Sequence, residues 1–151
     1  MPLQGDYEPS TEGWVREQVE KYEGSGGTEA LTLRNTGLPV VVVTSVGAKS
    51  GKLRKNPLMR VEHDGRYLAV GSQGGAPTDP HWVRNVREHP TVELQDRTHK
   101  WEMSVRELNG DERAEWWDRA VEAFPNYAKY QERTERLIPV FLLEPVAELP
   151  V

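Results

Sequence analysis

The sequence predicts a mainly β domain with flanking helices, an α+β fold built on about six mostly antiparallel strands. Three observations support this fold class. Short β-branched or alternating segments recur from residue 40 onward, turn signals separate them, and amphipathic helical segments interrupt them in only a few places. That many strands in about 110 residues favour a small barrel or a tight sandwich.

The strand segments are recognised by their composition and by the alternation of apolar and polar residues. Residues 40–46 are almost all Val or Thr, and Trp101, Met103 and Val105 alternate with polar neighbours. Asp64-Gly65 is a strong two-residue hairpin signal, which predicts that the segments on either side of it pair with each other. The predicted strands are residues 40–46, 56–61, 67–71, 91–95, 100–108 and 138–143, the last bounded by Pro139 and Pro145.

Helical segments show apolar residues three or four positions apart, followed by stop signals. The first covers residues 11–22 and ends at Gly24-Ser25-Gly26-Gly27. The second follows Thr78-Asp79-Pro80. The third begins at a cap in residues 109–111 and ends at Phe124, and the fourth holds Tyr127 and Tyr130. In the helix that ends at Phe124, the expected core-facing residues are Ala114, Trp117, Val121 and Phe124.

The chain is expected to form one domain overall. Residues 1–27 make an N-terminal helix and a flexible joint, and residues 28–151 make the barrel domain. The N-terminal helix acts either as a flap over a site or as a stabilising cover on the barrel, and the sequence leaves both readings open.

The composition restricts the chemistry of the protein. The 151 residues include no cysteine, which excludes disulfides and thiolate sites, so redox chemistry requires a borrowed cofactor. No apolar run approaches the roughly 20 residues of a membrane span, and residues 1–10 lack a secretory signal. A cytoplasmic protein is therefore expected, with a peripheral contact at the inner face of the cell membrane left open. The net charge of −5 argues against nucleic acid as a partner.

A cluster of cations follows the first predicted strand. Lys49, Lys52, Arg54 and Lys55 occur without an intervening acid, and Gly47, Ser50 and Gly51 supply sharp turns and further donors. Such a loop can bind phosphate or carboxylate groups. It is not a P-loop, because only three residues separate the glycines and Leu53 follows Lys52. From the residues alone it is either an anion site or a solvated turn, with nucleic-acid binding a weaker third reading.

A second glycine-rich loop, residues 71–77, lies between a predicted strand and a predicted helix. Its adjacent glycines, Gly74 and Gly75, leave room for a flat ring to approach the main chain, whose free N–H groups could bind carbonyl oxygens of that ring. The alternative is a simple turn.

Other kinds of site find little support. The histidines, His63, His81, His89 and His99, lack the spacing of metal ligands, so we expect no metal. The G-x-S-x-G elbow of serine hydrolases does not occur. Tyr127 and Tyr130 should point the same way, toward the core or toward a pocket.

Four motifs follow one another in the chain: V-T-S-V-G-A-K-S-G-K-L-R-K-N-P-L, D-G-R-Y-L-A-V-G-S-Q-G-G-A-P, P-H-W-V-R-N-V-R-E-H-P and F-P-N-Y-A-K-Y-Q-E-R-T-E-R-L-I-P-V. Together they resemble the deazaflavin-dependent nitroreductase family over about residues 40–145. The resemblance implies a split β-barrel of the FMN-binding type.

The resemblance also implies the cofactor, coenzyme F420, an 8-hydroxy-5-deazaflavin with a phosphate and an oligoglutamate tail. By carry-over from the family, the residues that hold the phosphate and the carboxylates are Lys49, Ser50, Arg54 and Lys55. Those that border the ring or contact it through the main chain are Asn56, Pro57, Ser72, Gln73, Gly74, Gly75 and Ala76, with Trp82 and Asn85 closing that side.

The implied reaction is hydride transfer from reduced F420 to a small electron-poor acceptor, such as a quinone or a nitro compound. Tyr127 and Tyr130 match tyrosines of the family's substrate pocket and, with Ser72, are the candidate catalytic residues. The chain departs from the family pattern at Ala48, Met59 and Phe124, which argues against nitroimidazole substrates more than against cofactor binding. The alternatives are a non-catalytic deazaflavin carrier and an FMN- or haem-binding member of the wider split-barrel group.

Overall fold

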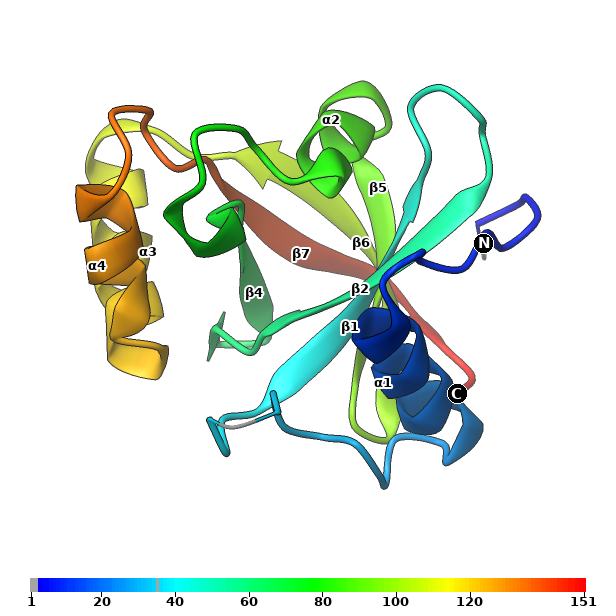
Figure 1. Ribbon diagram of the computed structural model, residues 1–151. Helices are drawn as coiled ribbons and strands as arrows, with labels where there is room; N and C mark the ends of the chain where they lie inside the picture. Colours follow the sequence, from blue (N-terminus) through cyan, green and yellow to red (C-terminus); the bar gives the residue numbers. More distant parts are fainter. Residues whose placement is uncertain (1–2, 35) are drawn as a thin grey trace.

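The computed structural model describes residues 3–34 and 36–151 and shows a curled antiparallel sheet surrounded by helices (Figure 1). The sheet has seven strands in the order β2-β1-β5-β6-β7-β4-β3. Its strands are β1 Val40–Val46, β2 Leu53–Met59, β3 Glu62–His63, β4 Arg66–Val70, β5 Thr91–Asp96, β6 His99–Glu107 and β7 Val140–Leu149. The helices are α1 Gly13–Gly24, α2 His81–Glu88, α3 Gly110–Ala123 and α4 Asn126–Glu132, with a short 3-10 turn η1 at Gln73–Gly75. The expected fold class is confirmed, with one strand more than predicted.

The extra strand comes from the Asp64-Gly65 turn. Both turn residues have positive φ, 53° and 78°, as a two-residue hairpin requires. The turn joins only the two-residue β3 to β4, because all seven residues of β2 pair with β1 instead. The prediction that residues 56–61 pair across this turn is therefore wrong for residues 56–59, although Val61 O accepts a hydrogen bond from the Leu68 N–H at 2.9 Å, and β4 pairs mainly with β7.

Strand β7 is longer than predicted. It continues through Pro145 to Leu149, so the prediction that the strand ends at Pro145 is wrong. The ladder with β6 shifts register between Glu102 and Met103. A bulge of this kind accommodates a proline, which has no N–H to donate to the ladder.

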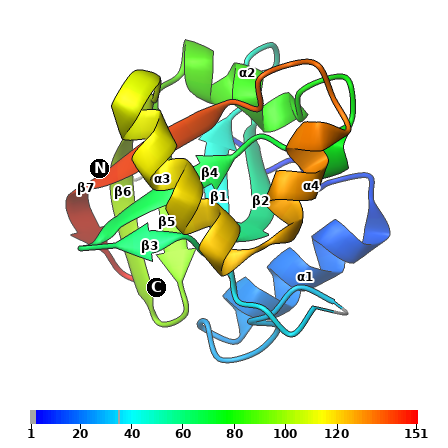
Figure 2. The same ribbon diagram turned by 90° about the vertical axis from the view of Figure 1, so that its left-hand side faces the viewer.

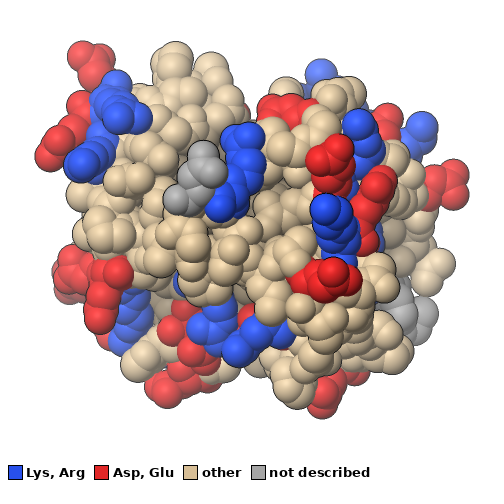
Figure 3. Space-filling view, turned by 60° about the horizontal axis from the view of Figure 1, so that its bottom comes forward, with Lys and Arg blue, Asp and Glu red and all other residues tan. Residues whose placement is uncertain are grey.

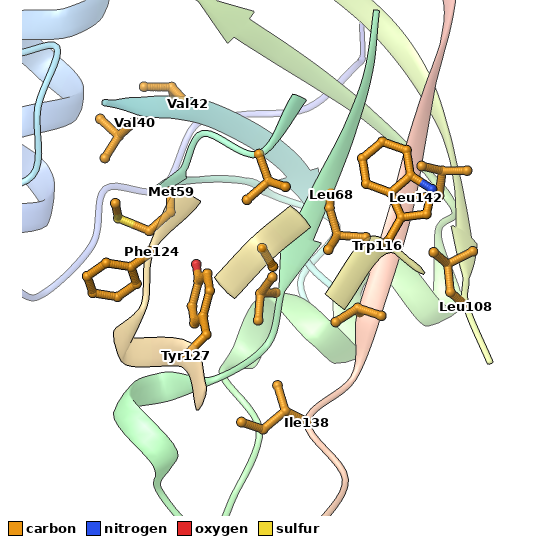
Figure 4. Close-up of a cluster of buried hydrophobic side chains, with 14 of the residues drawn as sticks. Val40, Val42, Met59, Leu68, Leu108, Trp116, Phe124, Tyr127, Ile138 and Leu142 are labelled. Carbon is orange, nitrogen blue, oxygen red and sulfur yellow. The ribbon is translucent and has the colours of Figure 1, made fainter. Parts of the chain in front are cut away.

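Both faces of the sheet are covered, which explains the apolar run in β1. Val40 and Val42 lie in a buried cluster with residues of α1, α3 and α4, whereas Val41 and Val43 lie in a second cluster with residues of α2. Side chains alternate between the two faces of a strand, so every residue at this point of β1 is apolar. Figure 2 shows α1, α3 and α4 covering one side of the sheet, and Figure 4 shows part of the first cluster.

Helix α3 buries the predicted face only in part: Phe124 at its end lies in the first buried cluster as expected, but the most buried residues of the helix were not predicted. Trp116 and Ala120 are its fully buried residues, whereas Ala114 is exposed, and Trp117 and Val121 pack at the margin of the first cluster. The arrangement follows from tertiary contacts around Trp116, whose ring is covered by the guanidinium groups of Arg119 at 4.6 Å and Arg66 at 5.5 Å.

Helix α1 packs closely against the barrel. Val15, Val19 and Tyr22 are buried, and the Tyr22 hydroxyl accepts a hydrogen bond from the main-chain N–H of Arg97 at 2.7 Å. At Gly27 an added Cβ would lie 1.6 Å from the carbonyl oxygen of Arg97, so the joint is pressed against the β5–β6 turn. These contacts match a stabilising cover better than a loose flap. None of the helices in residues 3–34 and 36–151 is long and apolar enough to cross a membrane.

Candidate functional site

The cation turn, residues 47–52 between β1 and β2, is held by its own hydrogen bonds. The N–H of Gly47 donates to Lys52 O at 2.8 Å, and the N–H of Lys52 donates to the Ser50 hydroxyl at 3.1 Å. Gly47 has no room for a side chain, since an added Cβ would lie 2.8 Å from Ser50 Oγ. Ser50 therefore shapes the turn, and Lys49 and Lys52 remain exposed at its tip.

Asn85 of helix α2 braces this turn. Its Oδ1 accepts a hydrogen bond from the Ala48 N–H at 2.9 Å, and its Nδ2 donates to Ser45 Oγ at 3.3 Å. Trp82 lies elsewhere: it is 6% exposed and packs edge to face on Phe141 within the second buried cluster. The structure thus places the Asn85 side chain at the cation turn and Trp82 in the second buried cluster, while their expected place at the side of the ring remains a prediction.

The two cations at the start of β2 are paired with acids of the N-terminal segment. Arg54 Nη1 lies 2.7 Å from Glu8 Oε2, and Lys55 Nζ lies 2.5 Å from Glu23 Oε2 of helix α1. The Lys55 ammonium also lies 5.2 Å from the centre of the Tyr7 ring. On the face shown in Figure 3, acidic and basic side chains are likewise interleaved.

Residues 5–8, here called the N-terminal strap, bring Glu8 into position. The N–H of Leu53 donates to Asp6 O at 2.7 Å, and the N–H of Glu8 donates to Leu53 O at 2.9 Å. The strap therefore adds a parallel bridge to the outer edge of β2. Figure 1 shows the N-terminal segment running beside the cation turn. No local signal in the sequence predicts this contact, because its residues lie far apart along the chain.

The ring loop, residues 71–76, has an unusual backbone. Ser72 has right-handed helical angles, and the next three residues, Gln73, Gly74 and Gly75, have φ of 45°, 64° and 80°. A right-handed residue followed by a left-handed one turns successive N–H groups toward one concave side, which suits an anionic or carbonyl oxygen. The N–H groups of Gly75 and Ala76 donate within the loop, to Ser72 O and Gln73 O. Those of Gln73 and Gly74 have no main-chain acceptor in the described part of the chain.

Arg136, to which no sequence motif assigned a role, lies between α4 and β7 and bonds the main chain of the ring loop. Its guanidinium donates to the carbonyl oxygens of Gly71 at 3.1 Å, Ser72 at 2.8 Å and Ala76 at 2.9 Å. It also bonds Asp79 Oδ1 at 2.7 Å. Three of the four partners are main-chain atoms, whose positions no side-chain pattern reveals.

The two candidate tyrosines of α4 belong to an aromatic cluster. Phe124 and Tyr127 meet edge to face with ring centres 5.0 Å apart, and Tyr130 lies 5.9 Å from Phe124. Tyr127 is 4% exposed, and this burial raises the pKa of its hydroxyl above the ordinary value, so it stays protonated. In Figure 4 its ring lies beside Phe124, with Met59 of β2 close by.

Helix α4 is packed directly against the ring loop. An added Cβ at Gly75 would lie 2.6 Å from the carbonyl oxygen of Tyr130 and 3.1 Å from Arg133 Cβ. The ring loop and the main chain of Tyr130 are therefore in direct contact. Ser72 is buried in this loop, with its carbonyl oxygen bonded to Arg136.

Strand β2 connects the separate parts of the site. Arg54 and Lys55 lie at its start, Asn56 and Pro57 follow, half-buried, and Met59 ends it in the cluster that contains Phe124 and Tyr127. Five steps of a strand span about 16 Å. The strand therefore leads from a cationic end to an aromatic end over the length of an extended ligand.

Two cavities lie away from these residues. One of about 110 Å³ is lined by Leu31, Pro39, Val40, Arg60, Asp96 and Arg97. The other, of about 230 Å³, lies against helix α1 and includes Trp14 and Gln18 in its lining. Neither is lined by a residue that the family resemblance assigned to the coenzyme or the acceptor.

Comparisons with known proteins find clear relatives. A family model described as F420H(2)-dependent quinone reductase matches residues 14–145. A putative F420H(2)-dependent quinone reductase of Mycobacterium tuberculosis is 31% identical over 108 residues, which cover 72% of this chain and 91% of the relative.

Solved structures agree with the observed fold. An F420-H2 dependent reductase, FDR-A, superposes with a TM-score of 0.67 at 53% identity, over 70% of this chain and 94% of the other. A chain described as a domain-swapped dimer gives a TM-score of 0.70 at 49% identity, over 87% and 97% of the two chains. A putative pyridoxamine 5′-phosphate oxidase from Listeria innocua, at 10% identity and a TM-score of 0.52, shares the fold alone.

Proposed function

Because this chain belongs to the F420H(2)-dependent quinone reductase family, we propose that it transfers a hydride from reduced coenzyme F420 to a quinone-type acceptor. The proposed site lies along strand β2, between the cation turn, the ring loop and helix α4. When bound, the reduced coenzyme supplies the hydride, so the residues of the protein bind, orient and shield the reactants.

The order of residues along β2 is the observation that carries this proposal. A phosphate and carboxylate tail suits the cationic start of the strand, with Lys49 and Lys52 exposed on the adjoining turn. A flat ring suits the middle of the strand, and a small acceptor suits its aromatic end. From its start to its end, strand β2 would thus lie beside the coenzyme tail, the coenzyme ring and the acceptor.

The ring loop fits the remaining requirement, which is a set of donors that a ring can approach closely. The N–H groups of Gln73 and Gly74 have no main-chain acceptor in residues 3–34 and 36–151. An added Cβ at Gly74 would meet nothing within 4 Å, so the space beside the loop is open. Polarised main-chain donors of this kind suit the carbonyl oxygens of a deazaflavin.

The tyrosines of α4 would act on the acceptor. Burial raises the pKa of Tyr127, so its hydroxyl stays protonated and can donate a hydrogen bond. Tyr130 is only partly buried and its main chain lines the ring loop, so its hydroxyl is better placed to orient an acceptor. Either hydroxyl could donate a hydrogen bond to the oxygen that gains charge as hydride arrives.

Titration with oxidised F420 and, separately, with FMN tests the choice of cofactor. We expect binding of F420 that weakens as salt is added, because partly exposed charge pairs are screened. Preferential binding of FMN would contradict the proposal. Oxidation of reduced F420 by a quinone such as menadione then separates a reductase from a carrier, which would bind the coenzyme without turnover.

The expected activity on nitro compounds and the expected location in the cell belong to the same proposal. Reduction of nitro compounds is tested by replacing menadione with a nitroaromatic acceptor in the same assay. The cytoplasmic location and the peripheral membrane contact are tested by cell fractionation.

A further inference from the structure

Arg136 holds the ring loop through several hydrogen bonds to its main chain. Its side chain is 16% exposed, and it bonds three carbonyl oxygens of residues 71–76 as well as the carboxylate of Asp79. A lysine could not make this pattern, because only a planar guanidinium presents several donors in a fixed fork.

The bond to Ser72 O is the critical one. A trans peptide unit is planar, so fixing the direction of a carbonyl oxygen also fixes the opposite direction of the following N–H. Arg136 holds Ser72 O at 2.8 Å, and this peptide unit carries the N–H of Gln73, one of the two loop donors without a main-chain acceptor among the described residues. Arg136, together with the Gly75 N–H that donates to the same oxygen at 2.9 Å, therefore fixes the direction in which Gln73 donates.

The backbone of the loop requires such support. Gln73 is a non-glycine residue at φ 45°, followed by two glycines that also have positive φ. Such conformations cost free energy and persist only where the surroundings hold them in place. Arg136 supplies the hold from the protein side, and the close packing of Gly75 on Tyr130 O supplies it from helix α4.

We propose that Arg136 is a positioning residue that holds the N–H of Gln73 in the direction needed to bind the coenzyme ring. The identity of the ring rests on the proposed function. The hydrogen bonds by which Arg136 holds the loop do not depend on that function. If Arg136 only stabilised the fold, replacing it would lower the free energy of unfolding without a specific effect on the loop or on coenzyme affinity.

The test is Arg136→Lys, which keeps the positive charge and so leaves the long-range attraction for an anionic coenzyme unchanged. Arg113→Lys is the matched control, because Arg113 also donates to a main-chain carbonyl in this region, Ile138 O at 2.6 Å, but does not contact the ring loop. Both variants are titrated with oxidised F420 by fluorescence, below the temperature at which either begins to unfold.

We expect Arg136→Lys to weaken F420 binding up to about tenfold, the loss that corresponds to one neutral hydrogen bond from the Gln73 N–H to the ring, and Arg113→Lys to bind like the parent. Affinity within twofold of the parent for Arg136→Lys, or an equal loss in both variants, would overturn the proposal. If Arg136→Lys does not fold, Asp79→Asn weakens the anchor of the guanidinium, and a severalfold loss of affinity is expected from it. Unchanged affinity in that variant would also overturn the proposal.

Amide hydrogen exchange without coenzyme provides a readout that does not depend on the proposed function. The N–H of Gly75, which donates to Ser72 O at 2.9 Å, should exchange faster in Arg136→Lys and at the parent rate in Arg113→Lys. If the parent binds no F420, the proposed function fails. If Gly75 exchange is unchanged in Arg136→Lys, the hold of Arg136 on the loop fails.

Discussion

The guanidinium of Arg54 lies 2.7 Å from the carboxylate of Glu8, so a cation suited to the coenzyme tail is already neutralised by the N-terminal strap. Lys55 is paired with Glu23 in the same way. Within the described residues, Lys49 and Lys52 have no acidic partner. A tail that reaches Arg54 must therefore compete with Glu8, whereas the tip of the cation turn is available at once.

Replacing Glu8 should strengthen coenzyme binding. In Glu8→Gln the charge that competes for Arg54 is removed, and affinity for F420 should rise roughly twofold to fivefold, since a partly exposed ion pair is worth up to about 1 kcal/mol. The control is Glu115→Gln, which removes the acid of a comparable pair with Arg119 on helix α3. Unchanged or weaker binding in Glu8→Gln would show that the tail does not reach Arg54.

Replacing Arg54 should have the opposite effect. Arg54→Ala should cost on the order of 1 to 3 kcal/mol of coenzyme binding, the usual value of a charge-assisted hydrogen bond. Its affinity should also depend less steeply on salt than that of the parent. Arg106→Ala, which removes an arginine paired with Glu112 and Glu144, serves as the control. Tight binding by Arg54→Ala with the parent's salt dependence would contradict the role of this residue.

Tyr130→Phe separates the acceptor from the coenzyme. The substitution keeps the ring and removes the hydroxyl, so F420 affinity should stay nearly unchanged while the turnover of menadione falls. A loss of about a hundredfold would indicate proton donation, and a smaller loss would indicate orientation of the acceptor. Tyr127→Phe is measured in parallel, because its hydroxyl lies deeper in the aromatic cluster. A variant that loses coenzyme binding, or one that turns over at the parent rate, would refute the assignment for that residue.

Gly75→Ala should destabilise the protein and Gly74→Ala much less so. Both glycines have positive φ, so an alanine costs about 1 kcal/mol of backbone strain at either position. Only at Gly75 does the added Cβ also meet another group, Tyr130 O at 2.6 Å, and α4 must move. Thermal unfolding of the two variants measures the difference. Equal midpoints would show that α4 is not packed on the loop as described.

The free energy of unfolding should fall at alkaline pH because of Tyr67. Burial raises the pKa of Tyr67, and its hydrogen bond to the carboxylate of Asp96 at 2.5 Å raises it further. The folded state therefore favours the protonated phenol. This contribution is fully present below the ordinary pKa of about 10 and is lost as pH rises toward the higher folded pKa. Between about pH 10 and 11, denaturant unfolding of Tyr67→Phe should show a shallower pH dependence than the parent. The same slope in both proteins would contradict this account.

Local chemistry in the sequence determined much of the fold. The Asp64-Gly65 pair strongly favours a turn with positive φ, and the structure has one there. The alternation of Trp101, Met103 and Val105 predicted the second hairpin, which β5 and β6 form. Four cations in one short segment marked the cation turn, because residues so close in sequence cannot lie far apart in space.

Only the tertiary structure decided how those elements combine. Local pattern could not show that β2 pairs with β1 and not across the Asp64-Gly65 turn, because the pattern of one segment does not identify the strand with which it pairs. The pairing of Arg54 with Glu8 joins residues 46 positions apart. Arg136 meets carbonyl oxygens more than 60 positions away, and main-chain acceptors leave no trace in a sequence. The sequence by itself therefore determined which groups are available for binding, while long-range packing decided which of them are already occupied and which remain available.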